Sequence, residues 1–495
     1  MAEVATGSAT ERGSTLRSID RFIADNHRWV TLAVFAIALV PRLYVAMAWA
    51  REPVWDGHYY HFGAGRIAEG VGYGDDRSGV FRPWCHYPVG YSGFLGLFYA
   101  VFGVKPTVAT AVQALVGAAT VATVHQLALT FLSHRRALIA ALLCAACPNL
   151  ILYSGLVMTE PLAGLGLLLA PLAFAKLSKK SNGTFDRRSL FASVVAGIIF
   201  GLTTLVRPQT LLCAPAVALL GPKRGGWKGR LAVAVMTTAM CFAVVLPWTV
   251  RNCKQMDSCA FVSTNAGWNL AIGSHPNATG RYIGLTSKDG CGDVVGQVDQ
   301  DRCFAHKGIQ WIKDDPVRWI SLAPVKLSFT FDHQSFAVGY LAQADPAAWP
   351  EERRAFYRRL MSMSQYVLIL LAALGALVLP RERKGDALLT FALALAPVLF
   401  MDGLFQQPER IWPLALAIPI FAVIPPLSRS SGGKVEYLAW SVATLVIVHI
   451  AFFGEDRYQV VVTPALALLA ACAFRPRVTD AEGEVARPKD AKETV

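Results

Sequence analysis

A polar stretch at 51–91 holds the side chains best suited to chemistry. It reads REPVWDGHYYHFGAGRIAEGVGYGDDRSGVFRPWCHYPVGY and lies between two strongly apolar segments. Asp56 follows shortly after an apolar run (30–50) that is long enough to cross a bilayer. A carboxylate there stays ionised in water and faces a substrate held in the membrane, so it could take a proton from a hydroxyl group. We predict that Asp56 is the catalytic base; the alternative is a carboxylate that pairs with an arginine or caps a helix.

Three arginines are candidates for binding an anion such as a phosphate. Arg207 precedes Pro208 at the end of one apolar run, Arg251 follows Trp248 at the end of another, and Arg457 lies between the last two runs. A guanidinium group binds phosphate oxygens in a bidentate way. Each arginine could instead be an interfacial anchor or pair with a neighbouring acid such as Asp456. Their placement on one face favours the phosphate-binding interpretation.

Further side chains are expected to contact substrate. Glu160 begins an apolar run, where it could equally complement a helix dipole. Aromatic rings in the loop could stack on a substrate or belong to the interfacial aromatic belt. The predicted substrate-binding set is Tyr59, Tyr60, Arg82, His86 and Glu160. No cofactor is predicted with certainty; a divalent metal is the open alternative, with His58 and His61 as weak candidates beside Asp56.

The composition is that of a membrane protein. Hydrophobic residues make up 54% of the 495 residues, charged residues only 16%, and the mean hydropathy is +0.41. A chain this apolar is expected to cross the membrane several times. The net charge of +13 comes from short basic clusters between apolar runs. Such clusters are typical of cytoplasmic loops and argue against a nucleic-acid partner.

The apolar runs predict an all-α polytopic protein with about twelve transmembrane helices. The predicted transmembrane domain (29–474) has cytoplasmic tails at 1–28 and 475–495 and extracytoplasmic loops at about 51–106 and 251–361. Each loop should contain a short interfacial helix, at 89–103 and 317–331; for the first, a short tilted span is the alternative. The predicted spans are 30–50, 107–132, 137–153, 156–175, 190–206, 210–220, 231–248, 366–379, 387–401, 411–424, 437–453 and 460–473.

Two further features follow from this topology. Arg42 lies deep in the first span and is therefore expected to face protein rather than lipid. Five cysteines fall in the outer loops: Cys85, Cys253, Cys259, Cys291 and Cys303. The simplest pairing joins the two sequence-near pairs, 253 with 259 and 291 with 303, and leaves one free thiol. A zinc site is the alternative.

Several motifs together resemble a known superfamily. They are WDGHYY with Ala64, Gly70 and Tyr73 after it, HYPVGY, MTEPL (158–162), VRPQTLL (206–212), PWTVRN (247–252), NAGWNLAIGSHPNATGRY (265–282) and GEDRYQVVVTPALALLAA (454–471). This set resembles the integral-membrane GT-C glycosyltransferases, in particular the group of aminoarabinose transferases, protein O-mannosyltransferases and lipopolysaccharide galacturonosyltransferases. One departure is Gly57, which follows Asp56 where many members have a second acid, so a metal held by an acidic pair is in doubt.

The resemblance implies a GT-C-like helical bundle in the plasma (inner) membrane. It implies transfer of a sugar from a polyprenyl-phosphate donor to an acceptor hydroxyl at the extracytoplasmic face, with Asp56 as base. The partners would be the lipid-linked donor, membrane lipids and a lipid, glycan or protein acceptor. The alternative function is a flippase or transporter of lipid-linked saccharides.

Overall fold

The computed structural model describes residues 22–77, 79–179, 185–221, 226–376, 411–423 and 433–474. The predicted span at 387–401, most of the N-terminal tail and the tail from 475 lie outside these ranges. Within them the protein is an all-α membrane protein, as the sequence predicted. Its one sheet in the described ranges is a two-stranded hairpin.

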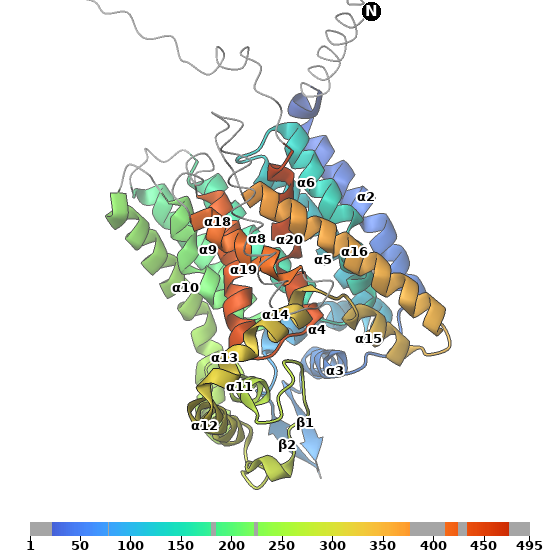
Figure 1. Cartoon of the computed structure of the whole chain (residues 1–495), viewed down its shortest axis with the longest axis vertical. Helices are drawn as coiled ribbons and strands as arrows, with labels where there is room; N and C mark the ends of the chain where they lie inside the picture. The colour runs from blue at the N-terminus through green and yellow to red at the C-terminus, as the bar shows by residue number, and fades with distance from the viewer. Residues whose placement is uncertain are drawn as a thin grey trace, which may run out of the picture.

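The membrane part is a bundle of mostly long apolar helices (Figure 1). Seven described helices are long and apolar enough to cross a membrane, and a bent pair raises the number to eight. The bundle consists of α2 (His27–Ala48), α5 (Pro106–Ala128), α6 (His134–Ala146), α7 (Pro148–Leu152), α8 (Glu160–Leu177), α9 (Arg187–Val206), α10 (Gly226–Gln255), α16 (Glu351–Ala376), α18 (Trp412–Val423), α19 (Lys434–Ala451) and α20 (Thr463–Cys472).

Prolines explain two departures from the predicted spans; a third is 460–473, where a 3₁₀ helix to Val461 is followed by the ten-residue α20. The predicted span 137–153 is divided at Pro148, where α6 and the following helix bend by 55°. The predicted span 210–220 is two short 3₁₀ helices, Pro208–Cys213 and Pro215–Leu220. A proline lacks the backbone N–H that an α-helix needs and clashes with the preceding turn; Pro148, Pro208 and Pro215 each start a new segment here.

Arg42 faces the protein interior, which confirms the prediction. Its side chain is fully buried and donates hydrogen bonds to the carbonyls of Ala38, Cys144 and Ala145. The last two carbonyls lie at the end of α6, directly before the bend. The arginine therefore satisfies carbonyls that the break in this span leaves without a helical partner.

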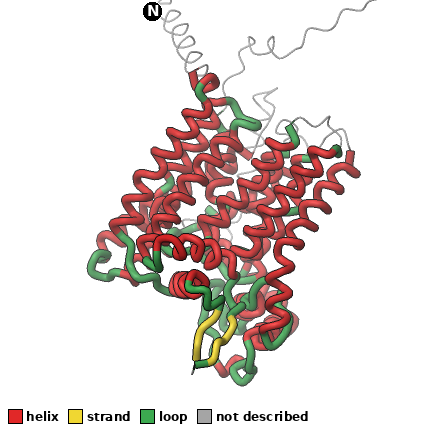
Figure 2. Tube along the Cα trace, turned by 180° about the vertical axis from the view of Figure 1, so that it is seen from behind, coloured by secondary structure: helices red, strands yellow, loops and turns green. Residues whose placement is uncertain are grey.

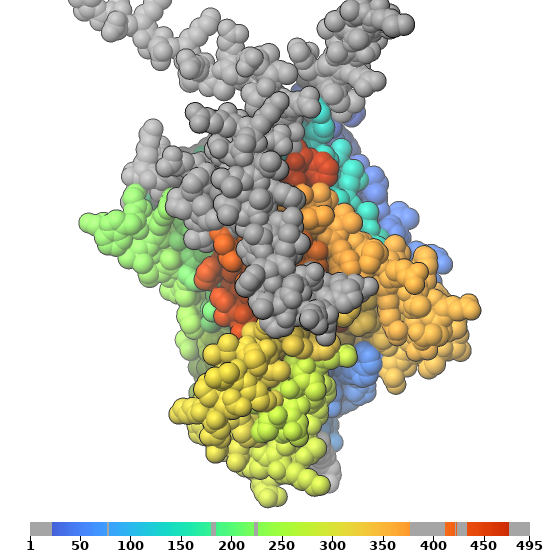
Figure 3. All heavy atoms as spheres, viewed as in Figure 1, coloured from blue at the N-terminus to red at the C-terminus, as the bar shows by residue number. Residues whose placement is uncertain are grey.

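The remaining helices and the hairpin gather at one end of the bundle, the lower end in Figures 1 and 2. Space-filling spheres show residues from about 250 to 330 forming the bottom of the face seen in Figure 3. These elements are α3 (Asp56–Ala68), β1 (Gly74–Arg77), β2 (Val80–Pro83), α4 (Val89–Phe102), α11 (Ala266–Ser274), α12 (Gln297–Asp314), α13 (Pro316–Ser321), α14 (Ala323–Phe331) and α15 (Phe336–Ala344). The strands pair antiparallel, Gly74 opposite Pro83.

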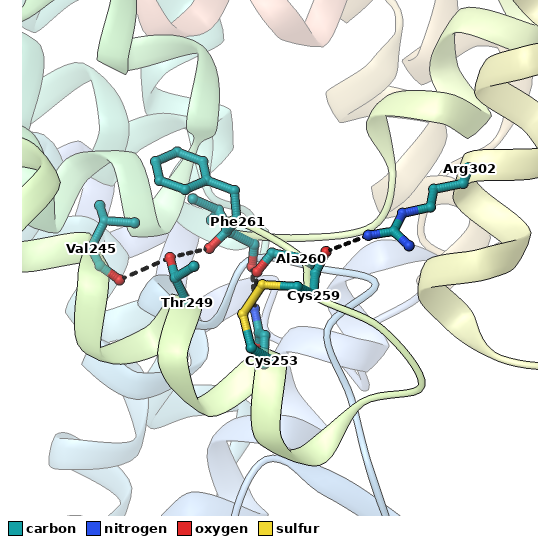
Figure 4. The surroundings of a disulfide bond; sticks show 9 residues. Val245, Thr249, Cys253, Cys259, Ala260, Phe261 and Arg302 are labelled. Atoms are coloured by element: carbon teal, nitrogen blue, oxygen red, sulfur yellow. Dashed lines mark hydrogen bonds between the residues drawn. A yellow bond between two sulfur atoms is a disulfide. The ribbon is translucent and has the colours of Figure 1, made fainter.

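Two disulfides lie in the segment 251–361, and both pairs are the predicted ones. Cys253 is bonded to Cys259 and Cys291 to Cys303, while Cys85 is a buried free thiol. Figure 4 shows the first disulfide at the chain reversal after α10, where the Arg302 guanidinium donates to the Cys259 carbonyl. The disulfides take the place of the zinc alternative; the first closes the turn after α10, and the second ties Cys291 to Cys303 of α12.

Candidate active site

Asp56 is the first residue of α3, at the lower end of the molecule in Figure 1. The preceding Trp55 has φ 52°, the one positive φ among the described non-glycine residues. Such a conformation is costly for a bulky residue and persists where packing enforces it. Here the indole packs against the rings of Phe336 and Tyr340, at centroid distances of 5.5 and 5.9 Å. Contacts from α15 thus stabilise the backbone conformation of Trp55 that orients the Asp56 side chain.

Both carboxylate oxygens of Asp56 have partners from distant parts of the chain. The Tyr87 hydroxyl donates to Oδ1 at 2.9 Å, and Arg457 Nη1 donates to Oδ2 at 2.6 Å. Burial alone would raise the pKa of Asp56, but the charge and hydrogen bond of Arg457 and the bond from Tyr87 outweigh it. The pKa of Asp56 therefore lies below its ordinary value, and the carboxylate is ionised at neutral pH.

Arg457 is shared between two carboxylates. Besides Asp56 it forms an ion pair with Glu455, from Nε to Oε2 at 2.6 Å, and its Nη2 donates to the Tyr458 hydroxyl. Burial raises the pKa of Glu455 and the charge of Arg457 opposes that rise. The predicted alternative partner of Arg457 was Asp456, and this detail is wrong. Asp456 instead accepts hydrogen bonds from the backbone N–H groups of Ser335 and Phe336.

Arg207 lies close to the cluster that Asp56, Tyr87, Glu455 and Arg457 form. Its Nη1 donates to Glu160 Oε1 at 2.7 Å and to the Thr159 hydroxyl at 3.1 Å. The Tyr458 ring lies against both guanidinium groups, 5.2 Å from that of Arg207 and 4.9 Å from that of Arg457. The start of α8, the end of α9, the start of α3 and the segment 455–458 therefore meet around one point. Four predicted site residues (Asp56, Glu160, Arg207, Arg457) are brought together there.

Arg251 has different partners. Its guanidinium donates to the carbonyls of Trp84 and Tyr73 and lies 4.5 Å from the centroid of the Trp248 ring. Trp84 and Tyr73 flank the hairpin, so Arg251 fastens the hairpin to the end of α10. In the part of the chain that the structure describes, none of the recorded contacts of Arg251 involves the other two arginines.

The predicted aromatic residues occupy two different environments. Tyr60 is buried, with its ring packed against Tyr87 and Tyr91. Tyr59 is 45% exposed and contacts the rings of Tyr87 and Trp84. Tyr87, which touches Asp56 directly, was not singled out from the sequence although it lies in the quoted motif HYPVGY. Burial, reinforced by the Asp56 charge, raises the pKa of Tyr87, so its hydroxyl remains a donor at neutral pH.

In the described ranges His58, His61 and Arg82 form no hydrogen bond or ion pair with Asp56, so the structure does not bring them to the cluster. The His61 ring is hydrogen-bonded to the Tyr99 hydroxyl, whereas His58 lies between the rings of Tyr59 and Phe62. Arg82 is exposed on β2. In the described ranges no three His, Cys, Asp or Glu side chains gather in a way that could hold a metal ion. The geometry therefore gives no support to a metal held by His58, His61 and Asp56.

His86 lines a cavity that opens beside Tyr87. Its ring contacts Tyr87 and Trp268, and burial lowers the pKa of His86 although the nearby Asp56 charge opposes this. The cavity has a volume of about 620 Å³ and is bounded by α3, the segment after the hairpin, α11 and α12. Its aromatic lining is Tyr59, Phe62, Trp84, Tyr87 and Trp268.

Comparisons with known proteins found similar solved structures and one matching family model. Among solved structures, the chain is similar to the oligosaccharyltransferase AglB from Archaeoglobus fulgidus, in complex with an inhibitory peptide and a dolichol-phosphate, with 16% identity over 90% of this chain and 50% of that chain and a TM-score of 0.43. It is also similar to ArnT from Cupriavidus metallidurans bound to undecaprenyl phosphate, with 14% identity over 90% of this chain and 77% of that chain and a TM-score of 0.38.

The present chain spans about half the length of the oligosaccharyltransferase chains that it matches. No curated protein sequence matches it. Residues 86–250 match the family model described as dolichyl-phosphate-mannose-protein mannosyltransferase. The matched segment contains His86, Glu160 and Arg207, whereas Asp56 and Arg457 lie outside it. The predicted resemblance to integral-membrane glycosyltransferases is thus confirmed, through a segment related to the dolichyl-phosphate-mannose-protein mannosyltransferases.

Proposed function

We propose that this protein is a glycosyltransferase that moves a sugar from a polyprenyl-phosphate donor to an acceptor hydroxyl at the extracytoplasmic membrane face. The observation that carries the proposal is the cluster at the end of the bundle. An ionised aspartate lies there beside two arginines that come from other parts of the chain. A base and a cationic group are the two requirements for displacing a phosphate from an anomeric carbon.

Asp56 is the general base in this proposal. The acceptor oxygen attacks the anomeric carbon while its proton passes to the Asp56 carboxylate, and the bond between that carbon and the phosphate oxygen breaks. The electron pair of the broken bond leaves with the lipid phosphate. The hydrogen bonds from Tyr87 and Arg457 fix the carboxylate in one orientation before substrate binds. Such preorganisation lowers the reorganisation needed during the reaction.

Arg207 is the residue best placed to bind the departing phosphate. Among the described contacts, its hydrogen bonds to Glu160 and Thr159 both use Nη1. A guanidinium group has five N–H donors, so Nη2 and Nε remain for a bidentate contact with phosphate oxygens. Arg457 adds positive charge and orients Asp56, and we assign Arg251 a structural role in the first outer loop instead.

The proposed side of the membrane is supported by two features. Both disulfides lie in the second outer loop, whose helices α11 and α12 share the lower end of Figure 1 with α3. Disulfides form and persist in oxidising compartments outside the cytoplasm. The alternation of basic clusters with apolar runs in the sequence is the one expected if this end lies outside the cytoplasm.

The test of the base is Asp56→Asn in purified protein supplied with a polyprenyl-phosphate sugar. Asparagine keeps the shape and the oxygen acceptor but is no useful base, so we expect transfer to fall by about a hundredfold or more. Thermal stability and donor binding should change little. Full turnover in this variant would contradict the role of Asp56. Movement of labelled lipid across vesicles without any glycosidic bond formed would favour the flippase alternative.

The test of the phosphate site is Arg207→Gln in the same assay. We expect the affinity for the donor to fall by about tenfold, because one charge-assisted bidentate contact is lost. Arg359→Gln, an exposed arginine of α16, is the matched control and should bind donor normally. Equal donor affinity in both variants would remove Arg207 from the phosphate site.

A further inference from the structure

We propose that the cavity beside Tyr87 binds a neutral saccharide and that the acceptor of the reaction is a hydroxyl group of that saccharide. This inference rests on the proposed glycosyltransferase function and adds the substrate class of its second substrate. It follows from the lining of the cavity, its charge and its position relative to Asp56.

The aromatic lining offers flat apolar surfaces of the kind on which sugar rings pack their C–H groups. Phe62 is 39% exposed and Tyr59 45% exposed, so both present free ring surface. The indole rings of Trp84 and Trp268, which also line the cavity, pack against neighbouring rings. Trp268 packs on Phe304 at 4.2 Å, and the Trp84 ring lies 5.6 Å from that of Phe62. Ordered rings of this kind bind with little further loss of conformational freedom.

The polar lining matches the hydroxyl groups of a sugar. Gln300 and Asp75 line the cavity next to the aromatic rings. Gln300 donates its amide nitrogen to the Cys291 carbonyl, which fixes the side chain. Among the described residues no recorded hydrogen bond engages its amide oxygen, which is therefore placed to accept from a ligand hydroxyl. Gln297 is committed instead to the protein, since its oxygen accepts from the backbone N–H groups of Cys85 and His86.

The charge of the cavity argues against an anionic ligand. Its lining in the described ranges includes the carboxyl group of Asp75 and no lysine or arginine. A phosphate or a uronic acid placed here would meet no fixed positive charge. The proposed site for the lipid phosphate is beside Arg207. The cavity is therefore available for a neutral substrate.

The position of the cavity assigns it to the acceptor. Tyr87 separates it from the catalytic group, because the Tyr87 ring lines the cavity while its hydroxyl bonds to Asp56. The other walls come from α3, α11 and α12, which lie at the outer end of the molecule (Figure 1). Arg207 and Glu160 lie at the ends of bundle helices. We therefore place the lipid-linked donor beside Arg207, at the ends of the bundle helices, and the glycan in the cavity on the other side of Tyr87.

The experiment measures binding separately from turnover. Asp56→Asn protein in nanodiscs is mixed with maltose, cellobiose, lactose or gentiobiose, or with a serine- and threonine-containing peptide, and contacts are detected by saturation-transfer NMR. We expect at least one disaccharide to bind. Phe62→Ala and Gln300→Ala, each added to this background, should weaken its affinity by about tenfold, the equivalent of one good contact. The matched controls Phe356→Ala and Gln255→Ala, both at exposed positions outside the cavity, should bind as the parent does.

Three outcomes would overturn the inference. They are the absence of any disaccharide signal in protein that still binds undecaprenyl phosphate, binding of the peptide alone, and saccharide binding that Phe62→Ala and Gln300→Ala leave unchanged. The proposed function has a different point of failure. If saccharide binds as expected but Asp56→Asn retains full transfer, the saccharide site stands and the base assignment falls.

Discussion

At the scale of single residues, the site depends on a carboxylate and a guanidinium group that are 401 positions apart in the chain. Arg457 keeps Asp56 ionised although the protein around it disfavours a charge. Because the ionised form is the base, the arginine controls the pH range in which the enzyme can work.

We therefore predict a changed pH profile for Arg457→Gln. In the native protein the pKa of Asp56 lies below its ordinary value, so activity is retained above that pKa and is lost as the pH falls through it. Without the arginine, burial is opposed only by weaker contacts, and the acid limb of kcat/KM should move up by about 1 to 3 pH units.

Two further variants make this prediction specific to charge. Arg457→Lys keeps the positive charge and should leave the acid limb close to its native position. Arg207→Gln should weaken donor binding and move the limb less than Arg457→Gln does, since the hydrogen bonds of Arg207 go to Glu160 and Thr159 and not to Asp56. An identical acid limb in Arg457→Gln and the native protein would show that another group is the base.

The sequence identified the main residues of the site but not their pairing. Asp56, Arg207, Arg457 and Glu160 were named because each stands at the end of an apolar run. Which acid pairs with Arg457 depends on the direction of each side chain around the start of the short helix at 456–461. The adjacent side chains of Glu455 and Asp456 have different partners. Tyr87 was missed because contact with Asp56 requires the loop to fold back over α3.

At the scale of elements, buried aspartates connect helices that the sequence could predict only separately. Asp456 accepts from the first N–H groups of α15, and Asp332 accepts from Ile411 and Trp412 at the start of α18. Each carboxylate satisfies helix donors that have no intrahelical partner. Apolar periodicity predicted the helices. The residues that cap them lie far away in the chain, so local sequence patterns could not reveal the caps.

The charged form of Asp332 is disfavoured at this buried position. Burial raises the pKa of Asp332 to about 6, although the Ser328 side chain and the helix N–H groups oppose the rise. The folded state therefore binds the proton more tightly than the unfolded state. The contribution of this group to stability is greatest at low pH and is lost as the pH rises through about 6.

Asp332→Asn should therefore stabilise the protein at neutral and alkaline pH. Asparagine keeps an oxygen acceptor for Ile411 and Trp412 and removes the buried charge. We expect a gain of about 1 to 3 kcal/mol at about pH 8 that disappears near pH 4, measured as thermal unfolding in detergent. Asp314→Asn, at an exposed position of α12, is the control and should show no such trend. A gain that does not vary with pH would contradict the buried charge as its cause.

At the scale of the whole molecule, the proposed chemistry requires the outer loops and the disulfides to face the same compartment. The sequence predicted the membrane class, most of the described spans and both disulfide pairs. It did so because hydrophobic length, basic clusters and cysteine spacing are local signals. It could not predict that the two loops would close around one cavity, since that depends on contacts between segments hundreds of residues apart, such as Gln297 with Cys85.

The orientation can be tested with single introduced cysteines, because the six free cysteines of the native chain are all buried and give little background. Val295 is 90% exposed in the second outer loop, and Trp227 is 69% exposed at the start of α10 beside a basic cluster. A membrane-impermeant maleimide should label Val295→Cys in intact spheroplasts and Trp227→Cys only after lysis, since charged reagents do not cross the bilayer. Labelling in the reverse order would put Asp56 in the cytoplasm, where a donor presented on the outer face could not reach it.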